Sequence, residues 1–115
     1  MYVIILGAGK IGYSIAEILI SNQHEVAVID SNKSKCEYID NALGSISVFA
    51  DQSLSNSLLK AGITRADLFI ATTKSDSENM LSCQLAKDHF KAKYTISITH
   101  SKEISRLFET ININY

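Results

Sequence analysis

The sequence predicts an α/β fold in which helices cover both faces of one parallel sheet. Short apolar runs alternate with helical patterns along the chain, a Gly-x-Gly-x-x-Gly motif follows the first run, and Asp30 closes the second. Such alternation is typical of parallel pairing, because each crossover returns the chain to the same end of the sheet. We expect a single domain with a doubly wound sheet of five strands in the order 3-2-1-4-5.

A glycine motif follows the first predicted strand, Tyr2–Leu6. In Gly7-Ala-Gly-Lys-Ile-Gly12, the first glycine permits a tight turn, the second lets the backbone approach a pyrophosphate, and the third lets the helix pack closely on the strand. The next helix has amides without an intrahelical partner, so we expect Ala8, Lys10 and Ile11 to donate to phosphate oxygens. The alternative is that the glycines only shape a tight turn.

The first helix and the second strand lead to an acidic residue. The helix is expected to end near Ser21 and Asn22. Its predicted apolar stripe consists of Ile11, Ile15, Ile18 and Leu19. Residues 25–29 form the second predicted strand, and Asp30 lies at its carboxyl end, where an acid accepts hydrogen bonds from ribose hydroxyls. Because this carboxylate repels a 2′-phosphate, it favours NAD over NADP.

The remaining elements follow from shorter patterns. We expect helices at residues 33–41 and 54–61, followed by Gly44 and Gly62, and strands at residues 45–50, 66–71 and 94–98. Ser75 and Glu78 have the spacing of a capping box, in which the serine side chain accepts one amide and the glutamate reaches back to the serine's own amide. The core side of that helix is assigned to Met80, Leu81 and Leu85.

The end of the chain contains two further patterns. Ile104, Leu107 and Phe108 indicate a last helix, and residues 110–115 alternate apolar and polar residues as though approaching another strand. Because the chain stops there, we expect a C-terminal crossover segment to be missing. Ile111, Ile113 and Tyr115 have two interpretations: they cover the edge of the sheet, or they join a partner subunit.

Composition argues against several classes of function. Hydrophobic residues make up 46% of the 115 residues, which suffices for one core, and the net charge of −1 provides no broad basic surface for nucleic acid. No apolar stretch approaches the ~20 residues of a membrane helix, and no signal peptide precedes Tyr2, so we expect a cytoplasmic domain. Cys36 and Cys83 are expected to be reduced, half-buried thiols, with a disulfide or redox switch as the alternative.

The predicted topology brings the polar residues of several loops together. Ligands of doubly wound sheets bind outside the carboxyl ends of the strands, where the strand order reverses. In the predicted order this point lies between strands one and four, where residues 7–12, Asp30, Asp51 and residues 72–74 meet. The sequence therefore predicts a Rossmann-like dinucleotide site.

Five segments of the chain resemble the Trk-type potassium-uptake regulatory domain, also called the TrkA N-terminal or RCK N-terminal domain. They are residues 5–12, 26–30, 61–67, 73–80 and 107–108. The segment Ala61-Gly-Ile-Thr-Arg-Ala-Asp67 separates this family from ordinary dehydrogenases. The resemblance covers nearly the whole chain.

The resemblance implies a cytoplasmic regulatory domain without catalytic activity. It implies binding of NAD(H), with ATP, ADP or AMP as alternatives, and gating of a membrane potassium transporter or channel by homodimers that build a ring at the inner face of the membrane. By position, residues 7–11 would hold the pyrophosphate, Asp30 the ribose, Asp51 and Gln52 the adenine, and Thr73 with Lys74 the far side. The residues assigned to the site are Gly7, Ala8, Gly9, Lys10, Ile11, Gly12, Asp30, Ser31, Asp51, Gln52, Thr72, Thr73, Lys74 and Thr99.

Two substitutions depart from the family pattern. Ala50-Asp51 replaces the usual Gly-Asp, which adds a methyl group near the adenine, and Thr99-His100 replaces an arginine that reaches ligand phosphate in many members. Lys10 has three interpretations: it supplies the missing charge, it reaches a phosphate in the opposing subunit, or it is solvated. His100 is interpreted either as a pH-sensitive phosphate contact or as a neighbour of a helix cap.

Two other classes of function are consistent with the fold. One is a small NAD-dependent oxidoreductase or a fragment of one, which needs a proton donor or acceptor beside its substrate. The histidines that would supply it, His24, His89 and His100, are far apart in the sequence. The other is an assembly domain that forms dimers and binds no nucleotide.

Overall fold

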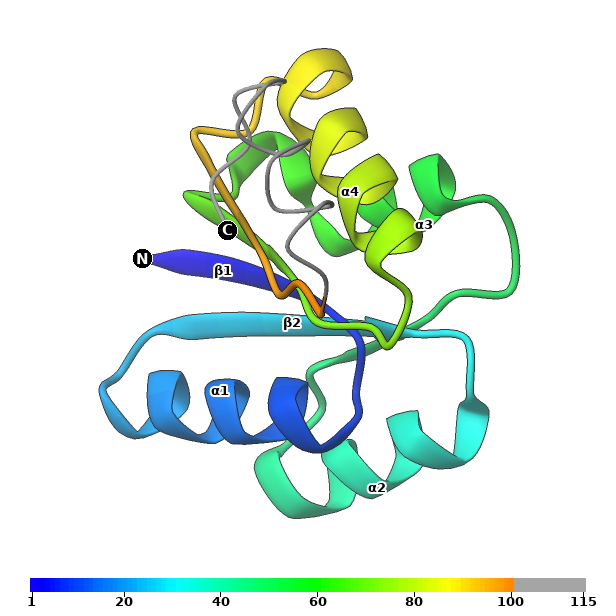
Figure 1. The fold of residues 1–115 in the computed structure, drawn as a ribbon. Helices are drawn as coiled ribbons and strands as arrows, with labels where there is room; N and C mark the ends of the chain where they lie inside the picture. The colour runs from blue at the N-terminus through cyan, green and yellow to red at the C-terminus, as the bar shows by residue number, and fades with distance from the viewer. Residues whose placement is uncertain (101–115) are drawn as a thin grey trace.

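The computed structural model describes residues 1–100, in which one sheet lies between two layers of helices (Figure 1). The strands are β1 (Tyr2–Leu6), β2 (Glu25–Asp30), β3 (Ser47–Phe49), β4 (Leu68–Ala71) and β5 (Tyr94–Ser97). Every pairing is parallel and the order is β3-β2-β1-β4-β5, which confirms the predicted topology. The predicted last helix, at Ile104, Leu107 and Phe108, and the alternating residues 110–115 lie outside the described residues.

Helices cover both faces of the sheet. They are α1 (Lys10–Ser21), α2 (Lys33–Leu43), α3 (Leu54–Ala61) and α4 (Asp76–Gln84), with a 3-10 turn η1 (Ile63–Arg65) after α3 and a π-helical turn η2 (Leu85–His89) after α4. In Figure 1, α1 and α2 lie on one face and α3 and α4 on the other. Right-handed crossovers produce this division, because the chain moves outward from β1 in both directions. Within residues 1–100, no helix has the length and apolar composition needed to span a bilayer.

Two apolar cores hold the helices on the sheet, and β1 contributes to both. Ile4 and Leu6 pack toward α3 and α4, whereas Val3 and Ile5 pack toward α1 and α2. All five residues of β1 are buried, because strands flank it on both sides and helices cover both faces. Among the described strands, β1 alone is buried along its whole length.

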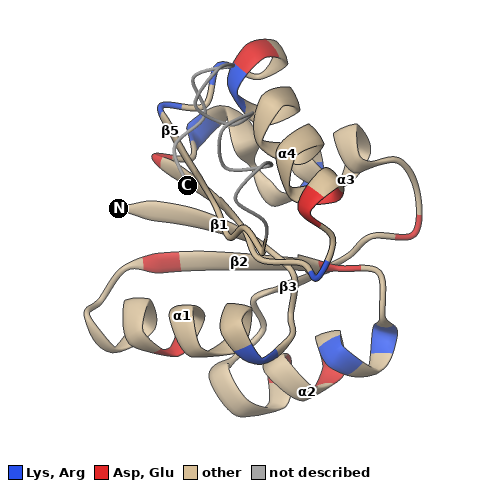
Figure 2. Cartoon of the chain, viewed as in Figure 1, with Lys and Arg blue, Asp and Glu red and all other residues tan. Residues whose placement is uncertain are grey.

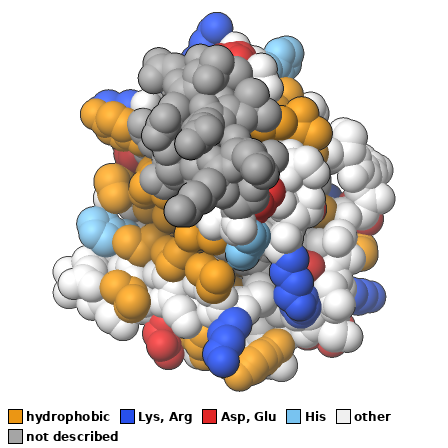
Figure 3. Space-filling model, viewed as in Figure 1, with side chains coloured by type: hydrophobic (Ala, Val, Ile, Leu, Met, Phe, Trp, Pro, Cys, Tyr) orange, Lys and Arg blue, Asp and Glu red, His pale blue; other side chains and the backbone are white. Residues whose placement is uncertain are grey.

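The predicted apolar stripe of α1 is wrong in part. Ile15 and Leu19 pack on the sheet, but Ile11 and Ile18 are 43% and 61% exposed. The buried residues of α1 are Gly12 and Ala16, and a side chain at Gly12 would meet the carbonyl oxygen of Gly7. Figure 3 shows apolar side chains gathered above α1 on this face.

Several predicted boundaries shift in the structure. Gly44 and Gly62 cap α2 and α3 as predicted. The strand predicted at residues 45–50 contains only Ser47–Phe49, the strand predicted at 66–71 begins at Leu68, and the turns η1 and η2 were not predicted. Leu81 was assigned to the core but is 59% exposed, because Cys83 and Ala86 occupy the side that faces the sheet.

The two cysteines are more deeply buried than predicted. Cys36 is 4% exposed and Cys83 is fully buried, and both are free thiols. Burial raises the pKa of Cys83 to about 12, so its reactive thiolate form is suppressed at neutral pH. These thiols are packing residues.

The family-specific segment at residues 61–67 lies at the opposite end of the sheet from the carboxyl ends of the strands. Asp67 Oδ2 accepts a hydrogen bond from the Tyr2 amide at 2.8 Å, and the Arg65 guanidinium lies 3.8 Å from the centroid of the Tyr2 ring. Arg65 also pairs with Glu25 at 2.7 Å. The segment therefore anchors the start of β1 and β2, which is a structural task.

Candidate functional site

A pocket of about 410 Å³ lies at the carboxyl ends of the central strands, where the strand order reverses between β1 and β4. Its walls come from the loops after β1, β2, β3 and β4 and from the first turns of the helices that follow them. The predicted site residues that line it are Gly7, Gly9, Asp30, Ser31, Gln52, Thr72, Thr73 and Lys74. The predicted convergence of these loops is thus confirmed as geometry.

Two of the three glycines are required by the fold. Gly7 has φ +110°, and a Cβ added to it would lie 2.7 Å from Thr72 Oγ1. A Cβ added to Gly12 would lie 1.9 Å from the carbonyl oxygen of Gly7. No side chain fits between α1 and the turn, so both positions must be glycine whatever the pocket binds.

Gly9 is different, because the protein itself does not require it to be glycine. A Cβ added there meets no atom within 4 Å, and the backbone at φ −76° is accessible to any residue. Gly9 lines the pocket and is the N-cap of α1. The space it leaves free lies beside the first helical amides, which have no carbonyl one turn earlier to bond.

Asp30 joins the loops after β1 and β2. Its Oδ2 accepts from the Ala8 amide and its Oδ1 from the Asn32 amide, both at 2.7 Å. The Ala8 amide, which was predicted to donate to phosphate, is therefore occupied by Asp30, and the amides of Lys10 and Ile11 remain for an anion. Each carboxylate oxygen keeps a lone pair that a ribose hydroxyl can use.

The wall after β3 combines a polar and an apolar part. Gln52 lines the pocket, and so do Ala50 and Leu54, which provide apolar side chains beside it. Asp51 does not line the pocket, because its carboxylate points to Lys60 on α3 in an exposed ion pair of 3.6 Å. Of the two residues assigned to adenine, the structure brings only Gln52 to the site.

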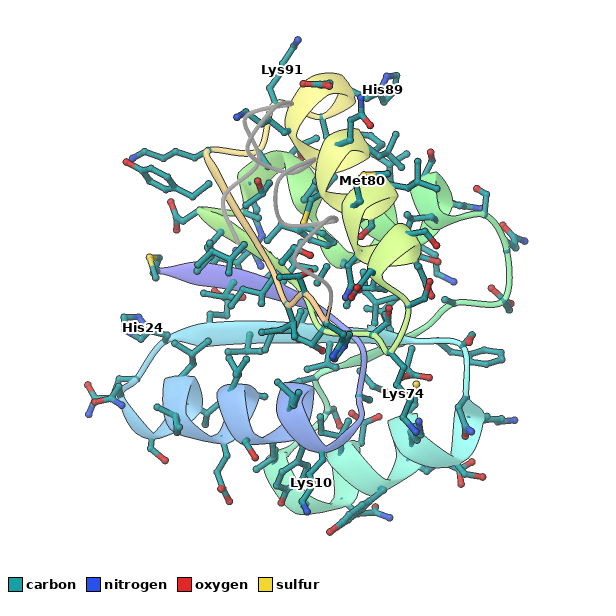
Figure 4. The ribbon with its side chains drawn as sticks, in the orientation of Figure 1. Lys10, His24, Lys74, Met80, His89 and Lys91 are labelled. Carbon is teal, nitrogen blue, oxygen red and sulfur yellow. The ribbon has the colours of Figure 1, made fainter. Side chains whose placement is uncertain are left out.

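Lysines surround the glycine turn. Lys35 of α2 and Lys74 after β4 line the pocket, and Figure 2 shows basic residues at the start of α1, at the start of α2 and in the loop after β4. Lys10 lines a second hollow of about 260 Å³ between α1 and α2, beside the stacked rings of Tyr13 and Tyr38. In Figure 4, Lys10 and Lys74 lie on different sides of the glycine turn.

The first turn of α4 is capped differently from the prediction. Ser75 Oγ accepts from the Glu78 amide at 3.1 Å, as expected of a capping serine. The Ser75 amide, however, donates to Thr73 Oγ1 at 3.3 Å and not to Glu78, whose side chain lines the pocket. The reciprocal half of the capping box is therefore wrong, because Thr73 provides a nearer acceptor.

Six predicted residues do not line the pocket. They are Ala8, Lys10, Ile11, Gly12, Asp51 and Thr99. His100, beside Thr99, donates its amide to Asp76 Oδ1 at 2.9 Å, and its ring nitrogen Nε2 lies 3.9 Å from the same oxygen. This geometry agrees with the interpretation of His100 as a neighbour of the helix cap.

The sequence reasoning missed six residues of the pocket lining. They are Leu6, Ile29, Lys35, Ala50, Leu54 and Glu78. Most end a predicted strand or fall in the first turn of the helix that follows, so their place at the carboxyl edge of the sheet was available as a signal. Lys35 is the most consequential, because it adds a cation one turn into α2.

Comparison with known proteins identifies relatives along the whole chain. The family model of the TrkA-N domain matches residues 3–115. The Trk system potassium uptake protein TrkA homolog of Methanothermobacter thermautotrophicus is 29% identical over 115 residues, which are 100% of this chain and 53% of the relative. The homolog of Pyrococcus abyssi is 39% identical over 87 residues, 76% of this chain and 38% of the relative. The chain thus spans about half or less of these relatives.

Solved structures share the fold at low sequence identity. The TrkA-N domain of the inner membrane protein ybaL from Escherichia coli has a TM-score of 0.88 at 16% identity, over 98% of this chain and 83% of that one. The GsuK channel bound to NAD has a TM-score of 0.80 at 22% identity, over 97% of this chain and 20% of that one. The C-terminal domain of Kef from Shewanella denitrificans in its AMP-bound form has a TM-score of 0.84 at 16% identity, over 98% of this chain and 68% of that one.

The pocket, the topology and the family model agree with the resemblance found in the sequence. The TrkA-N family model matches every residue of the chain except the first two. This chain belongs to the TrkA-N domain family.

Proposed function

We propose that this domain binds an adenine nucleotide in the pocket at the carboxyl ends of β1, β2 and β4, and that it thereby regulates a potassium transporter or channel. The observation that supports binding most strongly is Gly9, a glycine that neither packing nor backbone conformation requires. A ligand that needs the space of the missing side chain accounts for it. The alternative, that the motif only shapes a turn, accounts for Gly7 and Gly12 but not for Gly9.

The pocket has a place for each part of such a ligand. The pyrophosphate lies against Gly9, the lining residue that begins α1. It accepts from the amides of Lys10 and Ile11, which follow Gly9 just outside the lining, where the positive end of the α1 dipole also favours an anion. The ribose hydroxyls donate to Asp30, and the adenine lies against the apolar surface after β3, next to Gln52. NAD(H) is the first candidate ligand, and ATP, ADP and AMP share its adenosine phosphate.

Two lysines supply cationic charge to the phosphates. The family arginine after β5 is replaced by Thr99-His100, and His100 turns to Asp76. Lys35 and Lys74 line the pocket from two different loops and can approach the phosphates as point charges. The loss of one bidentate contact is therefore offset without changing the ribose or adenine contacts.

Regulation is favoured over catalysis. The curated relatives are named as potassium uptake proteins of the Trk system. A homodimer at the inner face of the membrane, bound to a potassium transporter or channel, would use the nucleotide as a signal if its two conformations bind it with unequal affinity.

A titration tests the proposal. NADH, NAD, ATP, ADP and AMP are added in turn to the purified protein, with heat of binding and melting temperature as readouts. We expect at least one to bind and to raise the melting temperature by linkage. A protein whose heat signal and melting temperature respond to none of the five contradicts nucleotide binding. Turnover of NADH with simple carbonyl compounds would support the oxidoreductase instead.

A further inference from the structure

Asn79 is a fully buried polar side chain in the first turns of α4. Its Oδ1 accepts from the Thr73 amide at 3.0 Å and from Thr73 Oγ1 at 2.7 Å. Its Nδ2 donates to the carbonyl oxygens of Thr73 and Ile98, both at 3.0 Å. The donors and acceptors of this amide group are therefore fully used by two partners, one after β4 and one after β5.

This arrangement does more than bury a side chain. An apolar residue fills a helix–sheet contact without the desolvation cost of an amide, and that cost is offset only when every hydrogen bond is made. Fully satisfied polar networks fix one geometry, whereas apolar packing tolerates several. The geometry fixed here is that of Thr73, whose amide, carbonyl and hydroxyl groups all bond to one side chain.

The residues that Asn79 holds belong to the pocket. Thr73 and the adjoining Lys74 line the wall after β4, and the Thr73 hydroxyl also accepts from the Ser75 amide at 3.3 Å. A loop held only by its own turn would let the backbone of Lys74 sample many positions. Ordering that backbone, together with the long lysine side chain, costs conformational entropy when a ligand binds. Asn79 removes the backbone part of that freedom before a ligand arrives.

The same helical turn holds the chain that leaves β5. Asn79 bonds the Ile98 carbonyl, and Asp76 bonds the His100 amide at 2.9 Å. The loop after β4 and the exit of β5 are thus fixed to one rigid element, α4. Any displacement of Thr73 would therefore be transmitted to Ile98 through the Asn79 side chain.

We propose that Asn79 is a positioning residue that holds the Thr73–Lys74 wall of the pocket in the geometry that binds nucleotide and couples that wall to the exit of β5. This inference rests on the proposed function. It assigns Asn79 no contact with the ligand, because Asn79 acts through Thr73.

Two variants of α4 separate positioning from stability. Asn79→Ala removes the network, and Ser82→Ala is the matched control, because Ser82 is equally buried on the same helix but donates only to the Asn79 carbonyl within α4. Affinity for NADH and for ADP is measured at a temperature at which both variants are folded. We expect Asn79→Ala to bind roughly tenfold more weakly than the wild type, from the loss of wall geometry, and Ser82→Ala to bind within about twofold.

If Asn79→Ala does not fold, the inference can be tested by NMR on the wild-type protein. The Asn79 side-chain amide and the His100 backbone amide are followed by NMR as nucleotide is added, and we expect both signals to shift at saturation. Unchanged signals, or an Asn79→Ala variant that melts earlier but keeps wild-type affinity, would overturn the inference alone. A wild-type protein that binds no nucleotide would instead overturn the proposed function, and the inference with it.

Discussion

The two walls of the pocket are built by different means. On the β1–β2 wall, glycines let the main chain fold back on itself, and one carboxylate, Asp30, joins the two loops through backbone amides. On the other wall, called the β4–β5 wall here, Thr73 and Lys74 line the pocket, and Asn79 of α4 joins Thr73 to Ile98 at the exit of β5. Both walls use a single polar side chain to hold two segments, but Asp30 faces the pocket and Asn79 lies buried behind Thr73.

The difference separates binding from positioning. Asp30 lines the pocket and is the proposed partner of the ribose, so its removal is expected to change a ligand contact and a loop contact together. Asn79 is fully buried, so its removal changes the contacts of the loop after β4 and of the exit of β5 but no direct ligand contact. Variants on each wall therefore have distinguishable effects on stability and on affinity.

The largest effect is expected at Gly12, on the β1–β2 wall. In Gly12→Ala the new Cβ would lie 1.9 Å from the Gly7 carbonyl oxygen, so α1 must move away from the sheet. We expect the free energy of unfolding to fall by about 3 kcal/mol or more, measured by urea denaturation. A variant as stable as the wild type would show that the close contact of helix and turn is not as described.

Asp30→Ala is expected to weaken binding strongly. It removes the proposed ribose acceptor together with the bonds to the Ala8 and Asn32 amides. A loss of about 2 kcal/mol corresponds to a dissociation constant about 30-fold higher, measured by calorimetry with NADH. Asp51→Ala is the matched control, since Asp51 faces Lys60 outside the pocket and its removal should change affinity by less than about twofold. Equal losses in both variants would contradict this assignment of the two acids.

Gly9→Ala should separate affinity from stability. The added methyl group meets no protein atom within 4 Å, so the free energy of unfolding should change by less than about 0.5 kcal/mol. The methyl group occupies the space assigned to the pyrophosphate, and we expect affinity for nucleotide to fall about tenfold, or about 1.4 kcal/mol. If affinity is retained, Gly9 has no part in the site.

The smallest effect is expected behind the β4–β5 wall. Thr95 of β5 is 2% exposed, and its Oγ1 has no hydrogen-bond partner among the described residues. Thr95→Val keeps the shape and removes a buried polar atom, so we expect the protein to gain about 1 kcal/mol in stability. Thermal unfolding measures this gain, and nucleotide affinity should not change. A loss of stability would indicate that the hydroxyl has a partner.

The β1–β2 wall could be predicted from the sequence because its requirements are local. Gly7 and Gly12 are steric necessities within six residues, and Asp30 follows directly from the end of a buried strand. The strand order follows from the alternation of elements and the handedness of crossovers. These rules need no knowledge of side-chain packing.

The β4–β5 wall could not be predicted, because its contacts depend on packing. The sequence did not indicate that Asn79 contacts Thr73. No local pattern predicted that the Asn79 side chain would be buried and the Leu81 side chain exposed. The same limitation explains Asp51, which matches the family pattern but faces Lys60. Position in a motif predicted the loop, and packing decided which side chains of that loop reach the pocket.

A crystal structure of the protein grown with NADH tests the central claim most directly. We predict electron density for the nucleotide in the pocket, with pyrophosphate oxygens within hydrogen-bond distance of the Lys10 and Ile11 amides and ribose hydroxyls on Asp30. Density for the nucleotide elsewhere on the protein, or a saturated crystal with only water beside Gly9, would contradict it.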